Sequence, residues 1–247
     1  MPTPSSGTSA SPRQPSASER LFSSLRDRIL RGELRPGDTL PPERKLAQQE
    51  GVHRTIVREA LKRLQQAGLI ESRRGGWSRV RDYRETGGLD LLPFLLRGVE
   101  NGNVDIDLAM DVMDLRAALA SDAAALAAQR RKDADLQALD KAVERMAGAR
   151  DSEDLAALQP LVMDFWRLVI EASGNLPYKL AYNSMREVYA RVQGPMRGII
   201  RDELLAVDDY REIAGALRRR QPGQARRIAT EVTTKGSRAI RKALERG

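Results

Sequence analysis

Apolar residues recur at helical spacing near the beginning of the chain. Leu21, Leu25 and Ile29 lie four positions apart, and their run ends before Gly32. This spacing places apolar side chains on one face of a helix, and glycine commonly follows the end of one. The pattern therefore predicts a first helix that begins near Arg20.

Two further short helices are expected before residue 68. Pro42 suits the first turn of the second helix, whose Leu46 and Ala47 would face the core. The third helix is predicted from about Arg54 to Ala67, with an inward stripe of apolar residues and an outward basic face. The inward residues are Val57, Ala60, Leu61 and Leu64, and the outward ones are Arg54, Thr55, Arg58, Lys62 and Arg63.

The segment LIESRRGGWSRV at residues 69–80 contains two short extended runs around Gly75 and Gly76. Runs of this kind predict a β-hairpin, with Arg73 and Arg74 at its tip. Three short helices followed by a basic hairpin are typical of a winged helix-turn-helix. The third helix of such a domain can enter the major groove of DNA, and the hairpin can hold arginines against the neighbouring backbone or minor groove.

The remainder of the chain has helical periodicity and almost no strand pattern. About seven helices are expected, over residues 89–99, 105–129, 133–149, 152–174, 176–194, 202–220 and from 222 to the end. The predicted fold is therefore mainly α, with a small α/β winged helix-turn-helix followed by an all-helical bundle. The domain prediction is a disordered tail at 1–18, the winged head at 19–82, a linker at 83–88 and the bundle at 89–247.

Charge is distributed unevenly along the chain. Residues 19–85 hold sixteen Lys and Arg against ten Asp and Glu, whereas residues 86–217 are net acidic. A basic head on an acidic middle suggests that the head meets a polyanion such as DNA, although a basic stretch can also be a solvated face.

Several classes of protein are disfavoured by composition. The chain has no cysteine, so disulfides, thiol nucleophiles and cysteine metal sites are ruled out. It has no run of eighteen apolar residues, and its Ser- and Pro-rich first segment lacks the apolar region of a secretory signal. We therefore expect a cytoplasmic protein with no membrane span. With no Gly-rich phosphate loop and a solitary histidine, an enzyme is not expected.

The segment LPPERKLAQQEGVHRTIVREALKRLQQAGLIESRRGG resembles the signature of the GntR family of bacterial transcription regulators. The helical pattern that follows, with EASGN at Glu171–Asn175, resembles the FadR subgroup of that family. ETGGLDLL and SGNLPYKLAYNSMREVYARV are similar to its fatty-acid-responsive members. The resemblance implies a homodimeric regulator, expected here as a repressor, that binds a palindromic operator and is controlled by a small-molecule effector bound in the helical dimerisation domain.

The resemblance also assigns residues to the DNA interface. The expected operator contacts are Arg44, His53, Arg54, Thr55 and Arg58, together with Arg73, Arg74 and Gly75 of the wing. His53 stands where the family usually has Ser or Thr at the start of the recognition helix. Ser and Thr cap a helix N-terminus well, whereas His does so poorly.

Many relatives of the bundle hold a divalent metal with one Asp and three His. The positions that align with this motif are Val162, Trp166, Tyr210 and Val232, and the one histidine of the chain, His53, lies in the predicted head. Metal binding of this type needs several imidazole nitrogens that converge on one point. No metal and no other cofactor are therefore expected.

By resemblance, the leading effector is a long-chain acyl-CoA, and Arg116 corresponds to an arginine near the pocket of relatives. Tyr182, Arg186 and Tyr189 fall on one helical face by their four- and three-residue spacing and could line a cavity wall. The expected pocket residues are Arg116, Trp166, Tyr182, Arg186, Tyr189 and Tyr210. The sequence leaves alternatives open. An inward Arg116 either faces an anion or forms an internal salt bridge with a neighbouring Asp. The tyrosines and Trp166 could also be core packing residues. The effector could instead be a small organic acid held by Arg116, or the protein could be an architectural DNA-binding protein without a sensor.

Overall fold

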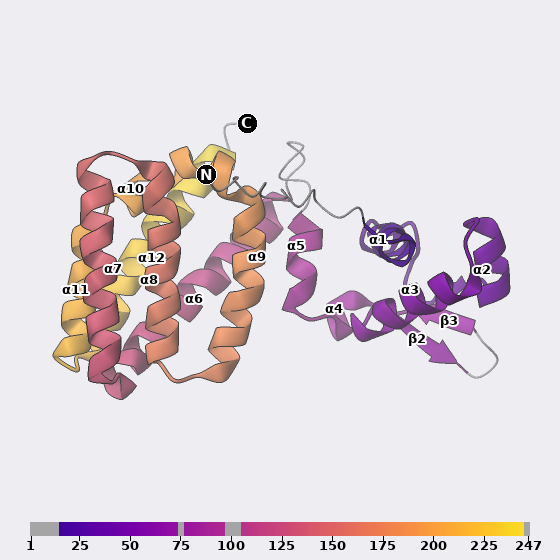
Figure 1. Cartoon of the computed structure of the whole chain (residues 1–247), viewed down its shortest axis with the longest axis horizontal. Coiled ribbons are helices and arrows are strands. Elements are labelled where there is room, and N and C mark those ends of the chain that lie inside the picture. Colours follow the sequence, from indigo (N-terminus) through magenta and orange to yellow (C-terminus); the bar gives the residue numbers. More distant parts are fainter. Residues whose placement is uncertain (1–14, 74–76, 97–104, 245–247) are drawn as a thin grey trace, which may run out of the picture. The chain divides into compact units, whose positions relative to one another are not determined.

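The computed structural model describes residues 15–73, 77–96 and 105–244 (Figure 1). It divides into two compact units, the first ending at Leu91 and the second beginning at Leu92. The first unit contains the small sheet, and the second is helical throughout its described residues. The predicted fold class, a winged helix-turn-helix followed by a helical bundle, is confirmed.

Three helices form the core of the first unit. They are α1 (Ala17–Leu30), α2 (Glu43–Gln49) and α3 (Arg54–Gln66). The Ser16 side chain caps α1 by accepting a hydrogen bond from the backbone N–H of Glu19 at 3.2 Å. The inward stripe predicted for α3 is confirmed, since Val57, Ala60, Leu61 and Leu64 are all buried. His53 is the N-cap residue of α3 and makes no side-chain capping bond, as expected for histidine.

A three-stranded antiparallel sheet completes this unit. The predicted hairpin consists of β2 (Ile70–Arg73) and β3 (Trp77–Val80), in the register Ile70 opposite Val80. β1 (Thr39–Leu40) pairs with the other edge of β3, so the strand order is β1-β3-β2. The sequence did not predict β1 because two residues are too few to show an alternating pattern. The hairpin tip at residues 74–76 lies outside the described residues.

A short helix returns the chain from the wing to the head. The segment expected as a linker contains α4 (Tyr83–Thr86), whose N-cap residue Asp82 accepts from the backbone N–H of Arg84. The hydroxyl of Thr86 donates to the carbonyl of Gly68 at 2.7 Å, which holds α4 against the turn that ends α3. A 3-10 turn, η1 (Leu89–Leu91), ends the unit.

The second unit is a bundle built mainly around two long helices that pack against each other, α6 (Ile106–Arg130) and α12 (Pro222–Leu244). The helices around them are α5 (Leu92–Leu95), α7 (Asp133–Asp151), α8 (Leu155–Ala172), α9 (Leu176–Ile199), α10 (Arg201–Leu204) and α11 (Val207–Arg218). Their core includes the buried alanines of α6 at positions 123–125, 127 and 128, whose small side chains let neighbouring helices approach closely.

Two predicted helices of the bundle are divided. The segment 89–99 forms η1 and α5 over its described residues, and the expected sixth helix splits at Leu205 and Ala206 into α10 and α11. Leu204, Val207 and Tyr210 are all buried, at the spacing of one continuous helical face. Apolar periodicity therefore gave no sign of this break.

Gly68 is required by the close approach of α4. Its φ is +72°, and a Cβ there would overlap the backbone carbonyl oxygen of Thr86 and lie 3.0 Å from its carbonyl carbon. Gly32 has a similar φ of +75° but has open space around it. Replacing Gly32 with alanine should therefore cost only backbone strain, about 1–2 kcal/mol.

We expect Gly68→Ala to destabilise the head by at least about 3 kcal/mol, because backbone atoms of Thr86 must also move. Hydrogen exchange of the buried amides of α3 in the full-length protein measures this difference, with Gly32→Ala as the matched control. Equal exchange rates in the two variants would contradict the assigned contact between Gly68 and α4.

Candidate functional site

The first candidate site is the outward face of α3. Arg54, Thr55 and Arg58 are exposed there, as are His53 before the helix and Arg44 on α2. All of the expected DNA contacts on α2 and α3, and His53 before α3, are therefore accessible to solvent, and His53, Arg54, Thr55 and Arg58 lie at the N-terminal end of α3. This is the end of a recognition helix that reaches base edges in helix-turn-helix domains.

Glu43 holds the two arginines of this face. Arg58 donates to both carboxylate oxygens of Glu43, from Nε at 3.1 Å and from Nη2 at 2.9 Å. Arg54 Nη2 lies 3.6 Å from the same carboxylate. The hydrogen bond from Arg58 is the largest contribution that lowers the pKa of Glu43. Glu43 therefore orients both guanidinium groups while leaving them largely exposed to solvent.

The wing supplies the rest of this face. Arg73 ends β2 opposite Trp77 in the hairpin register, while Arg74 and Gly75 lie outside the described residues. Trp77 was not among the predicted contacts, yet half of its surface is exposed beside the tip. A large exposed aromatic side chain is a feature of interaction surfaces. The sequence alone did not indicate it, because the exposure of Trp77 is known only from the structure.

The second candidate site is a cavity inside the bundle. Helices α6, α8, α9 and α12 contribute to its wall, which is almost entirely apolar, and the cavity volume is about 60 Å³. The lining residues are Val112, Met113, Arg116, Leu119, Ala120, Met163, Trp166, Ile170, Tyr182, Met185, Val188, Tyr189, Ile200 and Ile240. Four of the six predicted pocket residues, Arg116, Trp166, Tyr182 and Tyr189, are among them.

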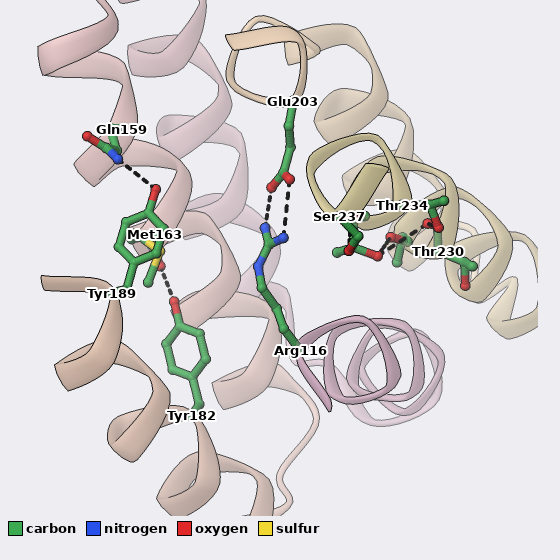
Figure 2. Close-up of polar contacts among 11 residues, drawn as sticks. Arg116, Gln159, Met163, Tyr182, Tyr189, Glu203, Thr230, Thr234 and Ser237 are labelled. Atoms are coloured by element: carbon green, nitrogen blue, oxygen red, sulfur yellow. Dashed lines mark hydrogen bonds and ion pairs between the residues drawn. The ribbon is translucent and has the colours of Figure 1, made fainter. Parts of the chain in front are cut away.

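Arg116 forms an ion pair with Glu203 at this cavity (Figure 2). Both terminal nitrogens of the guanidinium contact the carboxylate, Nη1 with Oε2 at 3.2 Å and Nη2 with Oε1. Burial acts to lower the pKa of Arg116, but the charge and hydrogen bonds of Glu203 outweigh it, and the pKa is raised. The expected partner was a nearby Asp, whereas the actual partner lies on α10, far along the chain.

Gly236 provides the space for this carboxylate. It is buried within α12, and a Cβ there would overlap Oε2 of Glu203 and lie 3.0 Å from its Cδ. Glycine in a helix interior costs about 1 kcal/mol relative to alanine, so this position is explained by the close approach of Glu203. Sequence reasoning missed Gly236, and an isolated glycine within a helical pattern is the signal that could have pointed to it.

The two cavity tyrosines direct their hydroxyls to protein atoms (Figure 2). The hydroxyl of Tyr182 donates to the carbonyl of Met163 at 2.6 Å, and that of Tyr189 accepts from Nε2 of Gln159 at 2.9 Å. Burial raises the pKa of both groups, so they are neutral at physiological pH. Each tyrosine therefore contributes mainly a ring to the wall.

Tyr210 and Arg186, also predicted for the pocket, do not line the cavity. Tyr210 is fully buried and packs edge-on against Phe165, at 5.1 Å between ring centroids, and against Trp166. Arg186 is exposed and borders a separate surface groove with Arg167. Around the axis of α9, at about 100° per residue, Arg186 lies about 40° to one side of Tyr182 and Tyr189 about 20° to the other side. Arg186 therefore lies at the edge of the face that the two tyrosines present to the cavity, where the helix meets solvent.

The four positions that the resemblance aligns with a metal motif lie in the interior of the bundle. Val162, Trp166, Tyr210 and Val232 are all buried. Among the described residues, no group of three or more His, Cys, Asp or Glu has an arrangement suited to a metal ion. Within the described part of the chain, the indole N–H of Trp166 and the hydroxyl of Tyr210 meet no partner with good hydrogen-bond geometry. In the same parts of the chain, no helix combines the length and apolar character needed to cross a bilayer.

Comparison with protein families places these two sites in a known context. A family model described as bacterial regulatory proteins, gntR family, matches residues 17–80, and a model of the FCD domain matches residues 111–234. The chain belongs to the GntR family. It is a transcription regulator with a winged DNA-binding head and an FCD effector-binding domain.

Individual relatives agree with this assignment. This GntR-family chain is 35% identical over 217 residues to the HTH-type transcriptional regulator Mce2R of Mycobacterium tuberculosis, covering 88% of each protein. It is 33% identical over 158 residues to the fatty acid metabolism regulator protein of Klebsiella pneumoniae, covering 64% of this chain and 62% of that protein.

A solved structure shares the fold. The regulator Lar, whose structure is described with its control of the Listeria monocytogenes agr system, superimposes with a TM-score of 0.56 at 18% identity, covering 94% of this chain and 99% of that one.

We expect Gly236→Ala to lower the free energy of unfolding of the bundle by about 2–4 kcal/mol, because the displaced Glu203 leaves Arg116 buried without its partner. Gly148, within α7, has open space where a Cβ would lie. Gly148→Ala is the matched control and should stabilise by about 0.5–1 kcal/mol through helix propensity. Urea unfolding followed by circular dichroism measures both, and an unchanged Gly236→Ala variant would show that Glu203 does not need this space.

Arg54→Ala and Arg58→Ala should each lower operator affinity more than tenfold while leaving the fold intact, because both side chains are exposed on α3. A gel shift measures this on a duplex that the wild-type protein selects from a random-sequence pool. Arg31→Ala, an exposed arginine at the end of α1, serves as the control and should lose less than threefold. Wild-type affinity in both α3 variants would remove this helix from the interface.

Proposed function

We propose that this GntR-family regulator is a homodimeric repressor of fatty-acid metabolism genes that is released from a palindromic operator by a long-chain acyl-CoA. The observation that carries the proposal is the apolar cavity in the FCD domain, whose wall suits a hydrocarbon chain. The relative named fatty acid metabolism regulator protein supports the same class of genes.

The DNA-binding part of the proposal rests on the exposed arginines that Glu43 orients on α3. In a two-fold symmetric dimer, two such helices meet successive major grooves, and the operator then has matching half-sites. The wing arginines are proposed to contact the backbone or the minor groove on either side.

The acyl-CoA part of the proposal needs cations for the phosphates as well as space for the chain. Ile240 lines the cavity near the end of α12, and Arg238, Arg241 and Lys242 of the same helix have exposed side chains. In this arrangement the acyl chain enters the cavity and the charged nucleotide end stays at the basic surface. Arginine and lysine are the usual partners of phosphate groups.

A small organic acid is the less favoured effector. Such a ligand needs Arg116 for its carboxylate, and Arg116 already contacts the carboxylate of Glu203 through both terminal nitrogens. An architectural role without an effector is distinguished by experiment, because it predicts no response of DNA binding to any small molecule.

We expect acyl-CoAs with long chains to stabilise the protein by about 2.7 kcal/mol at one hundred times their Kd, and to release the selected operator duplex at the same concentrations. Thermal unfolding and a gel shift measure the two effects. CoA without an acyl chain is the ligand control and should do neither.

A matched pair of variants locates the effect in the cavity. Ala120 lines the cavity and Ala118 is exposed on the same helix. Ala120→Phe should abolish the response to acyl-CoA while preserving operator binding, and Ala118→Phe should behave as wild type. If no acyl-CoA changes either the unfolding temperature or the gel shift, the proposed effector is wrong.

A further inference from the structure

We infer that Glu203 determines which ligands the cavity accepts, because it is a built-in carboxylate that neutralises Arg116 and occupies the end-on, bidentate position of its guanidinium. With this position filled, the cavity selects uncharged apolar chains and excludes small carboxylates. The inference rests on the proposed function, since it takes the cavity to be the effector site, and it adds the charge class of the group that enters.

Glu203 fills the end-on position of the guanidinium, where both terminal nitrogens meet one carboxylate. Both terminal nitrogens of Arg116 contact Glu203, which is the arrangement in which a guanidinium binds a carboxylate most strongly. The side chain of Glu203 is 1% exposed, whereas that of Arg116 is 17% exposed. The carboxylate therefore lies behind the guanidinium, and the pair is close to neutral where it meets the cavity.

The fold accommodates Glu203 specifically. Gly236 leaves the space that its carboxylate fills, and Arg116 Nη1 is 3.5 Å from the position a Cβ would take at Gly236. Three elements, α6, α10 and α12, thus converge on one ion pair. An arginine kept for a ligand anion would not need a glycine opposite it to admit a carboxylate from the protein.

The other polar groups of the described wall do not replace Arg116 as an anion site. The hydroxyl of Tyr182 donates to Met163 and that of Tyr189 accepts from Gln159. Neither these hydroxyls nor the indole N–H of Trp166 carries a charge that could balance a ligand carboxylate. A ligand carboxylate placed inside would lose its hydration and would approach Glu203, a like charge, without a free cation to offset either cost. A hydrocarbon chain, or one whose polar end is uncharged, meets neither obstacle.

The test compares two ligands of equal chain length, 1-octanol and octanoate, by isothermal titration calorimetry at pH 7.5 with the full-length protein. We expect the wild type to bind octanol at least tenfold more tightly than octanoate. Glu203→Gln keeps the shape of the side chain but removes its charge. This variant should bind octanoate more tightly than the wild type does, so that the ratio of octanol to octanoate affinity falls at least tenfold. Asp202→Asn removes the adjacent, exposed acid of α10 and should leave the ratio unchanged.

A double variant, Arg116→Met with Glu203→Met, shows whether Arg116 is the group that Glu203 blocks. Replacing both partners of a buried pair by apolar residues of similar size is commonly tolerated, so this variant also guards against misfolding of Glu203→Gln. We expect it to bind octanol and to reject octanoate as the wild type does. Gain of octanoate binding in the double variant would assign the effect to loosened packing and overturn the inference.

Three further results would overturn it: no octanol binding to the wild type, equal affinity of the wild type for the two ligands, or an unchanged ratio in Glu203→Gln. The outcome is separable from that of the proposed function. A charge-dependent ratio in a protein whose DNA binding ignores acyl-CoA would leave Glu203 as the selector and remove the proposed effector. If acyl-CoA released the operator but Glu203→Gln left the ratio of octanol to octanoate affinity unchanged, the proposed effector would stand and Glu203 would not be the selector.

Discussion

A charge inside an apolar bundle must be neutralised where it lies, and this requirement organises the effector domain. Arg116 of α6 is largely buried beside the cavity, so Glu203 must reach it, and Gly236 must be small for Glu203 to fit. Removing one partner of a buried pair is far more destabilising than removing both, because the remaining charge is left uncompensated. The short α10, the break after it and the glycine within α12 are all consistent with this one constraint.

The DNA-binding head uses the same chemistry under opposite conditions. Glu43 holds Arg54 and Arg58 at the surface, where water screens the charges and the net stabilisation is small. Such a pair can exchange its partners, and a phosphate can replace or share the carboxylate. The buried pair at Arg116 has no comparable freedom. The difference in exposure therefore explains why Arg54 and Arg58 can leave Glu43 for a DNA phosphate, whereas Arg116 stays paired with Glu203.

Sequence periodicity predicted what depends on local spacing. The buried stripe of α3, the hairpin and the long helices all followed from apolar positions three to four or two residues apart. Features set by distant contacts were not visible. Arg116 was expected to pair with a neighbouring Asp, since nothing in local spacing points to a glutamate 87 positions away. Arg186 shares a helical stripe with Tyr182, but only the packed neighbours decide where that stripe meets solvent.

The neutrality of the pair also limits how a ligand can act on the domain. A ligand that carried its own anion to Arg116 would exchange one ion pair for another and would displace α10. A hydrocarbon chain instead fills space between α6, α8, α9 and α12, whose side chains form the wall. Closely packed interiors respond to added volume by moving whole elements, because their side chains have little free space. The effect of an apolar effector is therefore a change in helix packing with the ion pair intact, and a coupling of a few kcal/mol to DNA binding lies within the range that such changes supply.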